Sequence, residues 1–208
     1  MYSKFPFKNF FPALIAMFAL TITSCNSNET NTSTETSDTT AAMSDTTSAT
    51  NEVSNQTGNM AEAVLSGTQQ DTTVTGMVRF NEENGKVKMT LDIMVPKKAN
   101  QSVAVHLHEH GACGDAGKEA HGHWNPTNEP HGKWGSGAFH SGDIGNVQLD
   151  ANGSGSLTLS TNRWTIGGDE KTNILNRAII VHSGVDDYKT QPTGNAGSRI
   201  GCGVIMSK

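Results

Sequence analysis

Residues 103–111 read VAVHLHEHG, a stretch in which apolar and polar side chains alternate. The apolar positions are Val103, Val105 and Leu107, and the alternate positions carry His106, His108 and His110. Successive side chains of a β-strand point to opposite faces, so the alternation predicts a strand with one apolar face and one imidazole face. A half-buried sheet usually presents Thr, Lys or Glu to solvent, and the histidine face therefore indicates a function.

The same β pattern recurs along the chain beyond residue 60. Residues 73–80 and 86–95 flank an Asn84-Gly85 turn signal, and residues 146–160 form a second hairpin pattern that turns at Asn152-Gly153. Further strands are expected at 101–109, 177–182 and 199–206. With no convincing helical pattern, about seven or eight short strands predict an all-β sandwich or barrel.

Two long segments separate the later strands, residues 111–142 and 183–198, and the first is rich in glycine, histidine and asparagine. Structureless loops of such length are uncommon inside a compact domain unless they have a function. We therefore expect these two loops to carry the site.

The N-terminal residues 1–24 have the pattern of an export signal. Lys4 and Lys8 precede an apolar run at 10–23 that is short for a membrane span. The residues ITSC at 22–25 resemble a bacterial lipobox, so we expect export and a lipid anchor on Cys25, in the periplasm or at the outer surface of the cell envelope. An ordinary secretory signal with an incidental cysteine is the alternative.

Residues 25–60 are expected to form a disordered tether after the lipidated cysteine. Beyond Cys25 they contain no Lys, Arg, Leu, Ile or aromatic residue, so they cannot bury enough apolar area to offset the entropy of ordering them. The folded domain is then 61–208. The chain has a formal net charge of −5 and no basic patch, which argues against nucleic acid as a partner.

All 8 histidines of the chain lie between residues 106 and 182. Imidazole is a preferred ligand of zinc and copper, and a carboxylate can complete a zinc site. Asp143 follows His140 closely enough for both to reach one ion from a single turn. These residues predict a metal centre.

Five segments of the domain resemble the copper/zinc superoxide dismutase family: HLHEHG, HGHWNP, HGKWGSGAFHSGDIGN, IIVHSGVDD and GNAGSRIGCGVI. The resemblance covers essentially all of residues 61–208. It implies an eight-stranded Greek-key β-barrel, an immunoglobulin-like sandwich, with copper and zinc held outside the barrel under two long loops. It also implies dismutation of superoxide to dioxygen and hydrogen peroxide, in defence of the cell envelope.

The same resemblance implies a role for individual residues. The implied copper ligands are His106, His108, His123 and His182. The implied zinc ligands are His123, His131, His140 and Asp143. His123 would thus bridge the two metals and carry a proton during turnover. His110 and His121 match no ligand position, and their simplest interpretation is as solvated residues, with adventitious metal binding as the alternative.

Further positions outside the ligand set also match the family. Arg199 is implied to guide superoxide to the copper, and Asp186 to orient two ligand histidines, His106 and His131. Cys113 and Cys202 are implied to form a disulfide, as expected for an even pair in an exported domain, whereas two free thiols are the alternative.

Two questions stay open at the level of sequence. The competing function is a non-catalytic, copper- and zinc-binding envelope lipoprotein, which the presence of Arg199 and of every implied ligand disfavours. The chain could be a monomer or a homodimer, because members of the family dimerise through different surfaces and some are monomers.

Overall fold

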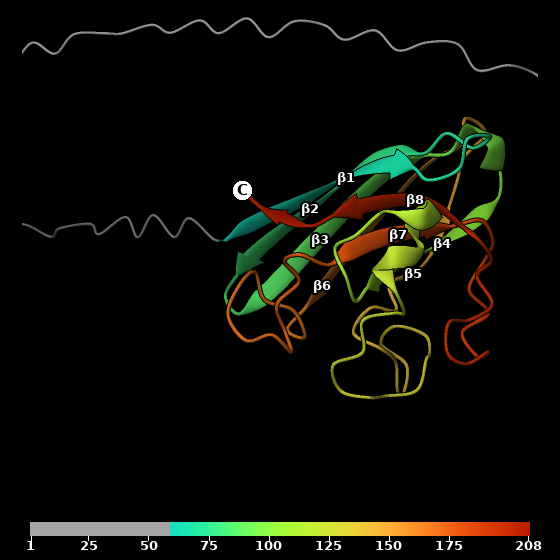
Figure 1. The fold of residues 1–208 in the computed structure, drawn as a ribbon. Helices are drawn as coiled ribbons and strands as arrows, with labels where there is room; N and C mark the ends of the chain where they lie inside the picture. Colours follow the sequence, from blue (N-terminus) through green and yellow to red (C-terminus); the bar gives the residue numbers. More distant parts are fainter. Residues whose placement is uncertain (1–58) are drawn as a thin grey trace, which may run out of the picture. The chain divides into compact units, whose positions relative to one another are not determined.

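The computed structural model describes residues 59–208, and strands account for most of its regular structure (Figure 1). The strands are β1 (Met60–Gly67), β2 (Thr75–Glu83), β3 (Lys86–Met94), β4 (Ser102–His108), β5 (Gly145–Gln148), β6 (Ser154–Thr161), β7 (Ala178–His182), β8 (Arg199–Val204) and β9 (Met206–Ser207). Two short 3-10 helices, η1 (Pro96–Lys98) and η2 (Asp115–Ala120), complete the described elements.

The strands pair antiparallel in the order β5-β4-β7-β8-β1-β2-β3-β6, and β9 adds to β1. β5 and β6, at the two ends of this order, contact each other, so the sheet is a nearly closed barrel. The structure therefore confirms the expected all-β, eight-stranded barrel. Consecutive strands that lie apart in the sheet, such as β3 and β4, give the barrel its crossed connections.

Alternate side chains of the strands fill the barrel interior. On β3, every second residue is buried and its neighbours face solvent. Val103, Val105 and Leu107 of β4 belong to the same core and are 0% exposed, as the alternation predicted. Burying side chains of this size stabilises the fold by about 1.5–3 kcal/mol each.

One strand was missed in the sequence. β1 pairs with β2 from Met60 to Ser66 and with β8 at Ser66 and Gly67, so it lies between these two strands in the sheet. Its buried positions are Ala61, Ala63 and Leu65. Because alanine is small and no strong turn signal precedes them, this alternation is weak in the sequence. The Asn84-Gly85 turn, by contrast, was predicted, and both residues have the positive φ (52° and 70°) that such a turn needs.

The loop after β4 folds back across the outer face of that strand. Trp124 donates its backbone N–H to Leu107 O at 2.8 Å, and Leu107 donates to Gly142 O at 2.9 Å. A Cβ on Gly142 would lie 2.1 Å from Leu107 O, so only glycine permits this approach. The loop thereby buries the imidazole face of β4 although that face points away from the core.

The loop before β8 lies on the same side of the barrel as the loop after β4 (red and yellow-green in Figure 1). Within residues 59–208, no helix has the length and apolar character needed to cross a membrane. The expected export signal, Cys25 and most of the tether lie outside the described residues.

Candidate metal centre

Neighbouring strands position the first group of histidines. His106 and His108 lie on the outer face of β4, and His182 ends the adjacent strand β7, where the pairing with β8 shifts register. Such a shift re-aims a side chain. His123 comes from the loop and pairs with His108 in an isolated β-bridge. Ligand atoms of these four buried histidines lie within 4.8 Å of one another.

The tautomers of His108 and His182 indicate a cation between them. His108 Nδ1 lies 2.9 Å from His121 O, and His182 Nδ1 lies 3.4 Å from Gly197 O. A carbonyl only accepts, so each Nδ1 carries the proton and each Nε2 keeps its lone pair. The two Nε2 atoms are 3.3 Å apart. Two lone pairs at this distance repel each other unless a positive ion lies between them.

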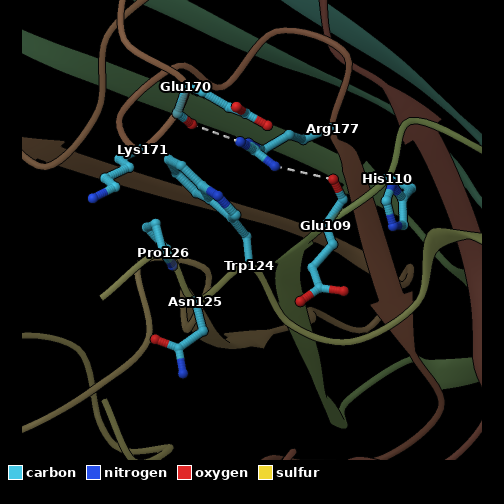
Figure 2. A pocket seen from close by; sticks show the side chains of 8 residues that line it. All are labelled: Glu109, His110, Trp124, Asn125, Pro126, Glu170, Lys171 and Arg177. Carbon is cyan, nitrogen blue, oxygen red and sulfur yellow. Dashed lines mark hydrogen bonds between the residues drawn. The ribbon is translucent and has the colours of Figure 1, made fainter. Parts of the chain in front are cut away.

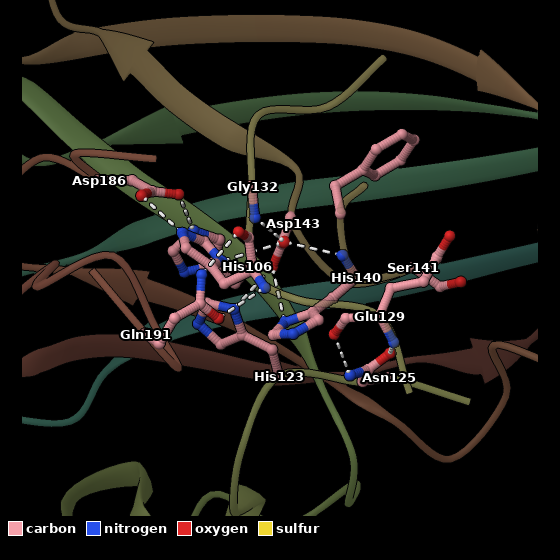
Figure 3. A network of polar contacts seen from close by, with 12 residues as sticks. His106, His123, Asn125, Glu129, Gly132, His140, Ser141, Asp143, Asp186 and Gln191 are labelled. Carbon is pink, nitrogen blue, oxygen red and sulfur yellow. Dashed lines mark hydrogen bonds and ion pairs between the residues drawn. The ribbon is translucent and has the colours of Figure 1, made fainter. Parts of the chain in front are cut away.

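Asp143 is the centre of a second group (Figure 3). Its Oδ1 lies 2.8 Å from His123 Nδ1 and 3.1 Å from His140 Nδ1, and its Oδ2 lies 3.0 Å from His131 Nδ1. The backbone N–H groups of Gly132 and His140 donate to the same Oδ2. Three imidazoles and one carboxylate are a zinc ligand set.

Two nitrogens, one in each of two central histidines, are buried and have no polar partner. They are His106 Nδ1 and His123 Nε2, whereas the Nδ1 atoms of His131 and His140 face the oxygens of Asp143. Buried polar atoms in folded proteins are nearly always paired, so each orphan needs an explanation. Metal coordination supplies it, because each nitrogen belongs to one of the two groups. The residues present therefore fit two metal ions.

The carboxylate of Asp186 contacts one histidine of each group, on the ring nitrogen that does not face the metal position. Its Oδ2 lies 3.0 Å from His106 Nε2 and its Oδ1 lies 2.9 Å from His131 Nε2, and the carboxylate is buried. Both Nε2 atoms therefore donate, which leaves each Nδ1 free to bind metal. Gly194 makes room for this carboxylate, because a Cβ there would lie 1.8 Å from Asp186 Oδ1.

Burial keeps most of the imidazoles neutral, which is the form that binds metals. It lowers the pKa of His108 and His182 well below the ordinary value, and lowers the pKa of His123 to about 4. His131 differs: burial disfavours its charged form, but the carboxylates of Asp143 and Asp186 raise its pKa to about 9. A proton on His131 thus takes the place beside Asp143 that a bound metal cation would take.

Arg199 begins β8 and pairs directly with His182 across the sheet. Its Nη1 donates to Gly117 O and its Nη2 donates to His121 O. These two carbonyls fix the guanidinium beside the first histidine group. The same loop is tied to β8 by a disulfide between Cys113 and Cys202, with an S–S distance of 2.00 Å, so these cysteines are not free thiols.

The sequence profile described as Copper/zinc superoxide dismutase (SODC) matches residues 74–205. The chain belongs to the copper/zinc superoxide dismutase family.

Individual relatives are similar over the same region. A superoxide dismutase [Cu-Zn] of Paramecium bursaria Chlorella virus 1 is 40% identical over 151 residues, which cover 70% of this chain and 76% of that protein. Superoxide dismutase [Cu-Zn] 2 of Aquifex aeolicus is 36% identical, covering 70% of this chain and 85% of the relative. The crystal structure of the clock protein EA4 is similar with a TM-score of 0.61 and 32% identity, covering 72% of this chain and 94% of that one.

Every ligand position expected from the resemblance to superoxide dismutases lies in one of the two groups, and His123 lies in both. Other supporting residues were missed. Gln191 accepts from His131 N at 2.8 Å and donates to His131 O at 2.9 Å, which fixes the backbone of that histidine. Arg163 binds Glu129 at 2.7 Å and so ties the first loop to the end of β6. These contacts join segments far apart in the sequence, and no local sequence pattern predicts them.

Asp186→Asn is expected to weaken metal binding in one of the two groups of this dismutase. An amide offers one acceptor oxygen, whereas His106 Nε2 and His131 Nε2 both need one, so one imidazole loses its orientation. We expect an affinity loss of about 10- to 100-fold, measured by competition with chelators of known strength. Asp187→Asn is the matched control, since Asp187 is exposed and contacts only its own turn. Equal affinities in the two variants would contradict the role given to Asp186.

Proposed function

We propose that the chain dismutates superoxide, with copper held by the all-histidine group and zinc held by the group around Asp143. The observation that carries the assignment is the His123 ring, whose Nδ1 faces Asp143 while its buried Nε2 has no partner. One imidazole is thus shared by two metal positions. Imidazole ligands suit copper, and the added carboxylate suits zinc.

The reaction moves one electron between two superoxide ions, so that one becomes dioxygen and the other, with two protons, becomes hydrogen peroxide. Bound copper supplies the one-electron redox chemistry, and bound zinc supplies a fixed positive charge. His123 Nε2 is the nitrogen that would hold either copper or a proton next to the reacting anion, since no hydrogen-bonding group of residues 59–208 occupies it.

Arg199 binds the substrate anion in this proposal. Two of its N–H groups are engaged by the carbonyls of Gly117 and His121, and a guanidinium has five, so donors remain for superoxide. The charge of the guanidinium is permanent, and its orientation is set before the anion arrives.

The deciding experiment measures metal content and superoxide consumption on the same purified chain. We expect one copper and one zinc per chain, and a rate well above that of the same concentration of free copper. A full metal complement with no more activity than free copper would favour the alternative, a metal-binding protein without catalysis.

We also propose that the chain is exported and anchored through a lipid on Cys25. The ITSC segment before that position and the apolar run preceding it support this proposal. The disulfide between Cys113 and Cys202 is consistent with it, because disulfides persist in oxidising compartments.

Cys25→Ser is expected to move the protein from the membrane fraction to the soluble fraction with its activity intact, because all residues of the two buried ligand groups lie between positions 106 and 182. Fractionation and mass spectrometry of the N-terminus measure the change, and Ser27→Ala serves as the control that keeps the cysteine. A wild-type chain without lipid would rule the anchor out.

A further inference from the structure

A cluster of metal-ligand side chains lies outside the two buried groups. It consists of Glu109, His110 and His121, whose ligand atoms lie within 4.8 Å of one another and whose side chains are all exposed. The rings of His110 and His121 have their centroids 4.4 Å apart at an interplanar angle of 83°. None of these residues belongs to the copper or zinc group.

The backbone holds the cluster together without help from its side chains. Glu109 N donates to Gly122 O at 3.1 Å, and His110 N donates to Ala120 O at 3.2 Å. These bonds fix the end of β4 against the residues around His121. The ligand atoms are therefore brought together by the fold, so an ion would not have to order a loose loop first.

The three side chains are free to bind an ion. Within residues 59–208, no hydrogen bond or ion pair engages the carboxylate of Glu109 or either imidazole. Arg177 approaches Glu109 but donates to its backbone carbonyl at 3.0 Å, while its guanidinium stacks on Trp124 (Figure 2). Glu109 and His110 line a surface hollow of about 460 Å³ beside this arginine, so solvent reaches them.

His121 has an unusual backbone for a histidine, with φ 60° and ψ −142°. L-residues other than glycine rarely adopt this conformation. Folding alone therefore favours glycine at this position, yet the position carries an imidazole that faces His110.

We propose that Glu109, His110 and His121 form a third, solvent-exposed site for a transition-metal dication such as Zn²⁺ or Cu²⁺. Two imidazoles and a carboxylate are ligands of that class of ion, whereas Mg²⁺ and Ca²⁺ prefer oxygen alone. Three protein ligands leave a coordination position for water, so the ion exchanges with solvent. The site does not depend on the proposed catalytic roles.

The test counts ions in the full chain already loaded with copper and zinc. Equilibrium dialysis against Zn²⁺, followed by metal analysis, is expected to show one additional zinc per wild-type chain. The double variant Glu109→Gln/His110→Gln should lose at least about tenfold in affinity for that ion, since disturbing even an outer partner of a metal ligand costs about 10- to 100-fold. Its buried copper and zinc should be retained.

Glu170→Gln is the matched control, because Glu170 lines the same hollow but lies outside the cluster. It removes the same charge and should leave the additional zinc in place. A wild-type chain that takes up no ion beyond the buried pair overturns the proposal. Equal loss of the additional zinc in Glu170→Gln also overturns it, since uptake would then follow surface charge alone.

Discussion

Arg199→Ala is expected to lower dismutase activity by about 30- to 150-fold while copper and zinc stay at one each per chain. The guanidinium is fixed by the carbonyls of Gly117 and His121, and the backbone of Arg199 pairs across the sheet with His182 of the all-histidine group. Alanine removes the charge and the remaining donors from the approach of the anion, but removes no metal ligand. The measurement is kcat/KM for superoxide together with metal analysis of the same sample.

Arg199→Lys separates charge from geometry. Lysine keeps the positive charge but lacks the planar fork that the two carbonyls hold, so its activity is expected to fall between wild type and alanine. Salt should reduce the difference between wild type and Arg199→Ala, because ions screen the attraction to the substrate. Full activity of Arg199→Ala at low ionic strength, with full metal occupancy, would show that another group binds superoxide.

Much of the barrel follows from local pattern, because alternation and turn chemistry are properties of neighbouring residues. Val103, Val105 and Leu107 were assigned to the core from their spacing alone, and they are fully buried. β1 was missed because Ala61 and Ala63 alternate with little apolar contrast. Its place in the sheet is decided by pairing with β2 and β8, which the local sequence does not specify.

The candidate site was predictable where a family motif spans it and unpredictable where the fold alone creates it. His131 matched a motif, but the contacts of Gln191 with its backbone join residues 60 positions apart. The same holds for the exposed histidines. The sequence alone predicts His110 and His121 as separate solvated residues, and only the backbone pairing near the end of β4 brings their rings together.

Removing the disulfide with Cys113→Ser/Cys202→Ser is expected to destabilise the domain by roughly 4–5 kcal/mol. The bond joins residues 89 positions apart. Closing a loop of that length removes conformational entropy from the unfolded chain and so raises its free energy by this amount. For a domain of this size, the loss corresponds to a fall in Tm of roughly 8 to 20 °C. Calorimetry of the metal-loaded proteins measures it, and wild type treated with reductant is the control for the substituted side chains.

The same double variant links stability to catalysis. Cys113 lies in the same loop as Gly117, whose carbonyl holds Arg199, and Cys202 lies in the strand that Arg199 begins. Without the bond, this loop can move relative to β8, so the guanidinium loses part of its orientation but none of its charge. Activity at a temperature where both proteins are folded should therefore fall, but by less than in Arg199→Ala. A double variant as stable as wild type would contradict the loop-closure argument, and one as inactive as Arg199→Ala would mean that orientation matters as much as charge.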